Sequence, residues 1–340
     1  MITGTHHGIV LIADRTYQRY NEVDIQGDSL EMISNDYFND IWNSLSQIAY
    51  SITHYNSPKE LIANSAQHQN DLVITIYGGR ASRNRMALVP AICEGAQIKF
   101  AGADTYARIV CQDKFLSKVF ANRFKIQSPK GVLIESSISE IILSELRFPL
   151  VVKPNFEGSS IGISESSKVM TIQDTLNEIE RQQKLFQQPI LVEEFIPGSE
   201  VCICIVGSPD NIRMFEVMEV ISEDDDAFFY NRLYTANEKH LSNKSIVHRP
   251  ITDQLNEEQK ANIIRMYKAL GKMDFMRVDG RVNNGSFTLI ELTPDGYLGS
   301  DSSFSDAYQG KGFSYDVLLR DIIRSALTYY QIPYSSYIKN

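Results

Sequence analysis

The sequence predicts an α/β protein built from more than one domain. Short apolar runs rich in β-branched residues alternate with longer segments that carry apolar residues at helical spacing. One of the runs, in the stretch 150–163, delivers Lys153 into a loop rich in glycine and serine. The chain has 340 residues, of which 43% are hydrophobic, and this is enough for a substantial core and more than one domain.

The charge of the chain narrows the class of partner. It carries 33 Lys and Arg residues against 42 Asp and Glu residues, a formal net charge of −9. Nucleic-acid binding needs a basic surface, so we expect no nucleic-acid partner and a small-molecule partner instead. No signal-peptide pattern opens the sequence, and no apolar run reaches the roughly 18 residues that span a bilayer. We therefore expect a cytoplasmic protein with no membrane partner.

The first hundred residues predict an open α/β unit. Apolar runs and helical spacing give, in order, strand 8–13, helix 35–52, strand 71–77, helix 86–93 and strand 97–100. The strand 71–77 ends at Gly78 and Gly79, and open α/β sheets usually place ligands at the carboxyl ends of their strands. We therefore expect a ligand near this pair of glycines.

The remaining elements follow from the same two periodicities. They are helix 104–120, the strand that carries Lys153, helix 171–185, strands 189–196, 200–206 and 212–220, helix 257–270, a hairpin of 276–279 with 287–293, and helix 315–330. Asn283, Asn284 and Gly285 supply the hairpin turn. The polar and aromatic connection 223–240 is long, and loops of that length are usually functional or disordered.

The loop after Lys153 has the chemistry of a phosphate site. Lys153 supplies a positive charge, while Gly158 and Gly162 let the backbone bend so that the N–H groups of residues 159–161 can face an anion. The chain contains no G-x-x-x-x-G-K-[ST] pattern, so this is not a Walker A loop. The alternative from these residues alone is an ordinary hairpin with a polar tip and an exposed lysine.

Acidic residues follow several of the predicted strands. Asp279 and Glu291 lie on the two strands of the predicted hairpin, so their carboxylates could converge on Mg²⁺ that bridges the phosphates of a nucleotide. The alternative is that both are solvent-facing strand residues. Glu193 and Glu194 allow the same two interpretations, since they directly follow the apolar Leu191 and Val192.

The order of these motifs resembles the ATP-grasp enzymes and, among them, the D-alanine–D-alanine ligases. The resemblance runs from about residue 71 to the end of the chain, and its motifs lie at 112–114, 152–162, 192–200, 277–279, Glu291 and 312–316. It implies an ATP-grasp fold: an N-terminal open α/β (pre-ATP-grasp) domain over 1–103, a central subdomain over 104–198 and a C-terminal subdomain over 199–340. The two subdomains would enclose the nucleotide, and the C-terminal one would carry the metal and catalytic residues.

The resemblance implies ATP as a cofactor. It assigns nucleotide binding to Lys114, Lys153, Glu157, Ser160, Glu193, Glu194, Phe195, Ile196, Glu200, Phe229 and Ile290. In this assignment the two lysines hold the phosphates, and Glu193 with the backbone of 194–196 meets the adenine. Glu200 hydrogen-bonds the ribose, while Phe229 and Ile290 pack against the base.

The resemblance also implies Mg²⁺ and a reaction. Asp279, Glu291 and Thr293 occupy the metal positions, Arg277 would stabilise charge on the carboxyl under attack, and Ser159 and Ser160 would close over the γ-phosphate. A carboxylic acid would take the γ-phosphoryl group to become an acyl phosphate, from which an amine displaces phosphate. We also expect the connection 224–240 to close as a lid over the γ-phosphate and to exclude water. A homodimer is expected.

Three departures from the family pattern predict a different, specialised pair of substrates. The family's acidic, serine-containing segment after the first strand is replaced at 13–20, and its second substrate loop is replaced at 77–85. Thr293 stands where the family has asparagine. Arg80, Arg83 and Arg85 would suit an anionic group. The candidate substrate residues are Tyr77, Arg80, Asp295, Ser302 and Ser303.

Other functions are compatible with these residues. The chain could be a true D-alanine–D-alanine ligase, or a nucleotide-binding regulatory protein that has lost catalysis through the change at Thr293. A kinase that stops at the acyl phosphate is a further alternative. Such a kinase would release ADP without needing an amine.

Overall fold

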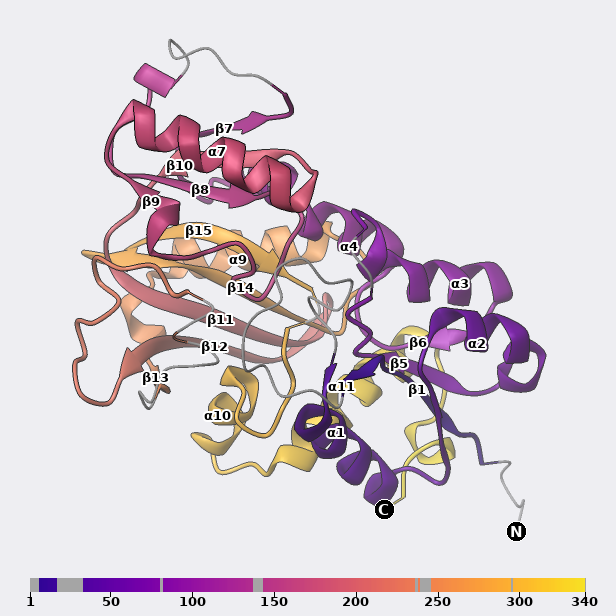
Figure 1. Ribbon diagram of the computed structural model, residues 1–340. Coiled ribbons are helices and arrows are strands. Elements are labelled where there is room, and N and C mark those ends of the chain that lie inside the picture. The colour runs from indigo at the N-terminus through magenta and orange to yellow at the C-terminus, as the bar shows by residue number, and fades with distance from the viewer. Residues whose placement is uncertain are drawn as a thin grey trace.

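The structure of the chain, a computed structural model, describes residues 6–16, 33–79, 82–136, 143–235, 238, 246–294 and 296–339. These residues form the expected α/β protein, with three main sheets and helices packed around them (Figure 1). A short parallel pair, β2 (Arg15–Thr16) and β3 (Ile33–Ser34), accompanies the first sheet. In the described part of the chain, no helix has both the length and the apolar character needed to cross a membrane.

The N-terminal sheet is parallel. Its strand order is β4 (Ile52–Tyr55), β1 (Ile9–Ile12), β5 (Leu72–Thr75) and β6 (Lys99–Phe100). β1 and β5 are buried along their whole length, as strands of a parallel sheet covered by helices are. The helices of this part are α1 (Asn35–Ile48), α2 (Pro58–Asn64) and α3 (Leu88–Ala96).

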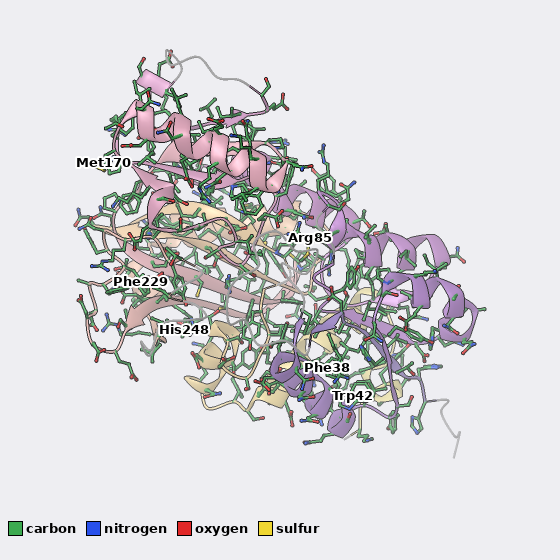
Figure 2. The ribbon with its side chains drawn as sticks, in the orientation of Figure 1. Phe38, Trp42, Arg85, Met170, Phe229 and His248 are labelled. Carbon is green, nitrogen blue, oxygen red and sulfur yellow. The ribbon has the colours of Figure 1, made fainter. Side chains whose placement is uncertain are left out.

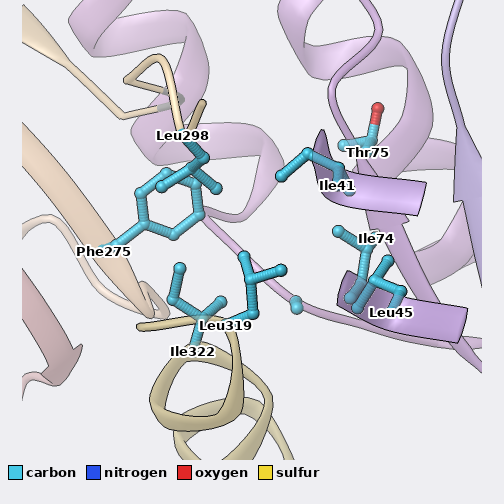
Figure 3. Close-up of a pocket in the computed structure, with 9 residues that line it drawn as sticks. Ile41, Leu45, Ile74, Thr75, Phe275, Leu298, Leu319 and Ile322 are labelled. Carbon is cyan, nitrogen blue, oxygen red and sulfur yellow. The ribbon is translucent and has the colours of Figure 1, made fainter. Parts of the chain in front are cut away.

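The C-terminal helix α11 (Tyr315–Tyr329) packs against α1 and joins the core of the N-terminal sheet. A small gap of about 10 Å³ lies between α1, β5 and α11. Figure 3 shows the residues that line it. Its lining is apolar apart from Thr75. A space of this size holds about one water molecule at most, so the contact is part of the core and not a ligand site.

The central sheet is antiparallel, with the order β7 (Gly131–Ile134), β10 (Ile190–Glu194), β8 (Leu150–Pro154) and β9 (Lys168–Val169). Helix α7 (Ile172–Phe186) packs against it and shares its apolar core (Figure 1). Thr171 begins this helix because its side chain accepts a hydrogen bond from the N–H of Asp174.

The C-terminal sheet is the largest. Its order is β13 (Ile246–Pro250), β12 (Asn211–Ser222), β11 (Ser199–Ser208), β14 (Phe275–Asn283) and β15 (Ser286–Thr293), all antiparallel. On β11, Val201, Ile203 and Ile205 pack with α9 (Glu257–Ala269) in one core. Cys202 and Cys204 point to the other face, where α10 (Ser303–Gln309) and α11 lie. This period-two alternation decides which strand residues can face a ligand.

Short 3₁₀ helices connect these elements, at η1 (Ser65–His68), η2 (Arg85–Ala87), η3 (Glu165–Ser167), η4 (Thr252–Gln254) and η5 (Tyr334–Ser336).

Three predicted helices have the wrong limits, and the one expected over 86–93 is the 3₁₀ helix η2 followed by α3 (Leu88–Ala96). The helix expected over 104–120 is two helices, α4 (Thr105–Gln112) and α5 (Lys114–Asn122). The break is at Asp113, whose extended backbone lets its side chain accept a hydrogen bond from the N–H of Leu116 and so cap α5. The helix expected over 35–52 ends at Ile48, because the next residue is extended and the chain turns into β4.

The predicted hairpin is confirmed, since β14 and β15 pair with Asp279 opposite Glu291. Helices α4 and α5 share their apolar core with the C-terminal sheet. The proposed domain limits at 103 and 198 stay a prediction.

Candidate active site

A cavity of about 780 Å³ opens between the central and C-terminal sheets and reaches the N-terminal sheet. Figure 1 shows the central sheet lying over the C-terminal one, with the N-terminal part beside both. The predicted site residues that line this cavity are Tyr77, Lys114, Lys153, Glu157, Ser159, Ser160, Glu193, Glu194, Phe195, Ile196, Glu200, Arg277, Asp279, Ile290, Glu291, Thr293, Ser302 and Ser303. Arg80 and Asp295 lie outside the described residues.

Lys153 is not the exposed lysine of a simple hairpin. Its side chain is 4% exposed, and its Nζ lies 2.5 Å from Oε1 of Glu193, which is itself 2% exposed. Lys118 on α5 lies 3.0 Å from the other carboxylate oxygen of Glu193. Burial opposes the charge on this carboxyl, but the two lysines keep its pKa below the ordinary value. The interpretation of Glu193 as a surface acid is wrong for the same reason.

Lys118 was not predicted as a site residue. Burial lowers its pKa to about 8, against the opposing effect of Glu193. The side chain also donates to the backbone oxygen of Ile290, at 2.8 Å. In sequence Lys118 is only one polar position of an amphipathic helix, so no local signal marks it.

The loop after β8 is strained at its serines. Ser159 and Ser160 both have left-handed backbone, with φ of 51° and 60°, and Gly162 follows with φ of 78°. Gly158 does not take this conformation, so the turn is made by the serines and Gly162. Non-glycine residues rarely adopt positive φ, and such strain often marks a functional loop. Ser160 Oγ donates to the backbone oxygen of Tyr234 at 2.8 Å, which ties this loop to the connection after β12.

Glu157 is held by the chain itself. Its carboxylate is 3.1 Å from Nη2 of Arg85 and accepts a hydrogen bond of 2.7 Å from Gln188. Lys114 donates to its backbone oxygen. Figure 2 shows Arg85 where the N-terminal part meets the other two sheets. Arg85 is one of the three arginines expected to suit an anionic substrate group, and its guanidinium is bound to Glu157 instead.

The acids of the hairpin are paired with basic groups. Arg277 binds both carboxylate oxygens of Asp279, at 2.7 and 3.1 Å, and Thr293 Oγ1 donates to the same carboxylate at 2.9 Å. Lys114 Nζ lies 2.7 Å from Oε1 of Glu291. Burial opposes the charge of Arg277, yet Asp279 beside it raises the pKa of Arg277 above its usual range. Cations and carboxylates thus neutralise one another along this wall of the cavity.

Glu200 has a partner that sequence reasoning missed. Arg281, 4% exposed, lies 2.7 Å from its carboxylate and donates to the backbone oxygens of Gly198 and Arg232. A third hydrogen bond goes to the backbone oxygen of Phe229. Arg281 lies two and four residues beyond Asp279 and Arg277, so period-two alternation on this strand was the signal that could have found it.

Phe229 does not line the cavity. The residue is 2% exposed, and its ring packs against Phe228 and Tyr234. The aromatic side chain expected beside the base therefore lies in the core. Ile290 does line the cavity.

The acid that follows the first strand is also engaged by the chain. Asp14 accepts hydrogen bonds from the backbone N–H groups of Gly78 and Gly79, at 2.9 and 2.8 Å. Its carboxylate closes the turn after β5. Tyr77, beside this turn, lines the cavity.

The donors around Asp279 fit a hard cation. Two carboxylates and a hydroxyl, all oxygen donors, lie on paired strands, which suits Mg²⁺. Among the described residues no group of three or more His, Cys, Asp or Glu side chains could hold a metal without other ligands. Mg²⁺ is commonly bound by one or two carboxylates together with phosphate oxygens, so the set fits a metal that arrives with a nucleotide.

An antiparallel sheet that carries a lysine and a strained Ser/Gly loop, set over a second sheet that carries paired acids, defines the chain as an ATP-grasp protein. The family model described as "D-ala D-ala ligase C-terminus" matches residues 122–324. The chain belongs to this family, and it is an ATP-dependent ligase of the D-alanine–D-alanine ligase type.

Individual relatives agree with this family. A D-alanine–D-alanine ligase from Halalkalibacterium halodurans is 28% identical over 269 residues, which cover 76% of this chain and 82% of the relative. The structure of the D-alanine–D-alanine ligase from Bacillus anthracis complexed with ATP has a TM-score of 0.71 at 20% identity, covering 96% of this chain and 99% of that one. The VanG D-Ala:D-Ser ligase from Enterococcus faecalis has a TM-score of 0.68 at 23% identity, with 95% and 100% covered.

Proposed function

We propose that the chain is an Mg²⁺-dependent ligase that uses ATP to join a carboxylic acid to an amino acid through an acyl phosphate, with a substrate pair other than two D-alanines. The observation that carries this proposal is the set of ion pairs in one cavity: Lys153 with Glu193, Lys114 with Glu291, and Arg277 with Asp279. Bound ATP would offer phosphate oxygens to Lys153 and Lys114, and Mg²⁺ would offer a cation to Asp279 and Glu291.

The phosphates of the nucleotide would replace the carboxylates that now pair with the lysines. Lys114 and Lys153 would bind phosphate oxygens, with Ser159 and Ser160 closing over the γ-phosphate from the loop. Glu193 and the backbone of 194–196 would meet the adenine, and Glu200 the ribose. Support comes from the position of these residues around one cavity and from the two buried lysines, whose present partners are carboxylates that a phosphate can replace.

Asp279, Glu291 and Thr293 would hold Mg²⁺, which when bound neutralises phosphate charge during phosphoryl transfer. Arg277, which lines the same cavity beside Asp279, would place its guanidinium near the carboxyl under attack, where its charge would favour the tetrahedral arrangement. The threonine is a weaker ligand than an amide. Thr293→Asn is therefore expected to lower the Mg²⁺ concentration needed for half-maximal turnover.

The acid substrate should differ from D-alanine. The first D-alanine carries an ammonium group that needs an acidic partner, yet Asp14 is bound to the amides of Gly78 and Gly79 and does not line the cavity. A carboxylic acid without this ammonium group, or with it placed elsewhere, fits better. The homodimer stays a prediction.

An acid-by-amine screen for ADP release, with mass detection of the product, tests the proposal. ADP release should need both an acid and an amine, and the product should be their amide. Lys153→Met, assayed in parallel, controls for contaminating ATPase activity. ADP release without any amine would support an acyl-phosphate kinase instead and would contradict the proposal.

D-alanyl-D-alanine synthesis is the second candidate, because the relatives named above are D-alanine–D-alanine ligases. The same screen separates the two. If D-alanine alone gives the highest kcat/KM of all combinations, the second candidate is correct and the specialised pair is excluded.

A further inference from the structure

A histidine and an aspartate form a pair in the wall of the cavity, and the reaction proposed above does not use them. His248 lies on β13, and its Nδ1 is 2.7 Å from Oδ2 of Asp306 on α10. The two side chains are 16% and 33% exposed. His248 lines the cavity from the sheet side, close to α10 (Figure 2). Within the part of the chain that the structure describes, Nε2 of His248 has no hydrogen-bond partner.

Asp306 determines which ring nitrogen of His248 carries the proton and which one can accept a hydrogen bond. A carboxylate can only accept, so Nδ1 must carry the proton of their hydrogen bond. In the neutral ring Nε2 then keeps its lone pair and accepts a hydrogen bond. The hydrogen bond to Asp306 also fixes the orientation of the ring. A carboxylate bound to the other ring nitrogen does the same for histidines that bind a metal.

The immediate neighbours of His248 are apolar apart from Asp306. Val220, its cross-strand neighbour, and Ile246 line the cavity beside it. The cavity as a whole carries both acids, such as Asp301, and guanidinium groups, such as Arg277. At His248 itself, a carboxylate of the ligand would meet the lone pair of Nε2 with Asp306 behind the ring, whereas a hydroxyl or ammonium group can donate to that lone pair.

The part of the cavity wall that contains His248 lies apart from the residues proposed to bind the nucleotide and the metal, so it is available to the amine substrate. The proposed nucleotide residues Lys153 and Glu193 belong to the central sheet, and the proposed metal acids lie on β14 and β15. The turn at Tyr77 belongs to the N-terminal sheet. The rest of the wall includes β13 and the start of α10, where Ser302 and Ser303 also line the cavity, besides parts of β11, β12 and the segment before α10.

We propose that His248, oriented by Asp306, is a specificity subsite that accepts a hydrogen bond from a hydroxyl or ammonium group on the side chain of the amine substrate. The inference rests on the proposed ligase function. His248 would contact the substrate, and Asp306 would act as a positioning residue through the imidazole.

Direct binding tests the subsite without turnover. Protein labelled with ¹⁵N-histidine, with ADP and Mg²⁺ present, is titrated with D-serine, D-2,3-diaminopropionate, D-alanine and D-aspartate, and the imidazole ¹⁵N resonances are recorded. His248→Phe identifies the resonance. D-serine or D-2,3-diaminopropionate should shift Nε2, and D-alanine should not. No shift with any probe, or the largest shift with D-aspartate, would overturn the proposal.

Turnover gives the second readout. The ratio of kcat/KM for D-serine to that for D-alanine should fall about tenfold in His248→Phe, the value of roughly one hydrogen bond. Asp306→Asn should lower the ratio through KM for D-serine and change the tautomer signal of His248. His68→Phe is the matched control, because His68 pairs with Asp71 at 2.8 Å and does not line the cavity. An unchanged ratio in His248→Phe would overturn the subsite, whereas absent ADP release with every amine would contradict the ligase function and leave the binding experiment to decide the subsite.

Discussion

Lys153 shows how burial changes what a single substitution will do. In sequence it is a lysine at the mouth of a polar loop, whose removal should leave the fold intact. In the structure it is buried against Glu193, with Lys118 as the second cation. A buried carboxylate that loses a partner is costly, so this residue contributes to stability as well as to the site.

Lys153→Ala should therefore abolish ATP turnover and also lower the free energy of unfolding by about 1–3 kcal/mol, which is less than the cost of leaving a buried charge with no partner, because Lys118 remains. Urea unfolding without nucleotide measures the loss. Adding Glu193→Gln should recover part of the stability but not the turnover. Unfolding identical to the parent would show that Glu193 does not depend on Lys153.

Lys118 predicts a pH dependence of stability. Its pKa is about 8 in the folded protein, below the ordinary value of 10.5, mainly because of burial. Between these two values the unfolded chain binds the proton and the folded protein does not, so the free energy of unfolding rises with pH across this window. Below about pH 8 the lysine is charged in both states and its burial costs stability.

Urea unfolding of the parent and of Lys118→Met from pH 7.5 to 10 isolates this residue. The rise in stability with pH should be smaller in the variant, since the other titrating groups are common to both proteins. Equal slopes would mean that Lys118 keeps an ordinary pKa.

At the scale of elements, Arg281 connects β14 to the chain that follows β12. Its guanidinium binds Glu200 and the backbone oxygens of Gly198, Phe229 and Arg232. The same connection is held from the other side by Ser160 at Tyr234. The start of the proposed lid is thus fastened to the proposed ribose site and to the proposed phosphate loop.

Arg281→Met should lower the free energy of unfolding by about 2 kcal/mol, because Glu200 and several backbone oxygens lose their partner. Amide hydrogen exchange over 229–234 should become faster. Arg213→Met is the matched control, since Arg213 pairs with Asp321 at 3.2 Å elsewhere on the sheet. Unchanged exchange over 229–234 in Arg281→Met would contradict the connection.

At the scale of the whole molecule, the cavity is built from all three sheets. The ion pairs that line it join residues of α5, β8, β10, β14 and β15. The unfolded chain cannot reproduce this arrangement, so a ligand that binds there must stabilise the folded state.

A nonhydrolysable ATP analogue with Mg²⁺ should therefore raise the free energy of unfolding, by about 2.7 kcal/mol at a concentration 100 times Kd. Thermal unfolding with the analogue, with and without Mg²⁺, measures the effect. Lys153→Ala should show a much smaller increase. An equal increase in parent and variant would place the nucleotide outside this cavity.

The sequence by itself determined the class of fold and the order of the elements, and most of the residues that it marked for the site line one cavity. These features depend on local chemistry: periodicity separates helices from strands, and alternation on β14 puts Arg277 and Asp279 on one face. The limits of helices were less well predicted, since the break at Asp113 depends on a side chain that caps the next helix.

Only the tertiary structure decided which charges meet. Lys153 and Glu193 lie 40 residues apart and share a face of two neighbouring strands, while His248 and Asp306 lie 58 residues apart and come from a strand and a helix. Phe229 was expected at the base and lies in the core, where its ring packs against Phe228 and Tyr234. Such contacts depend on the packing of one element against another, and a linear pattern of residue types does not contain that information.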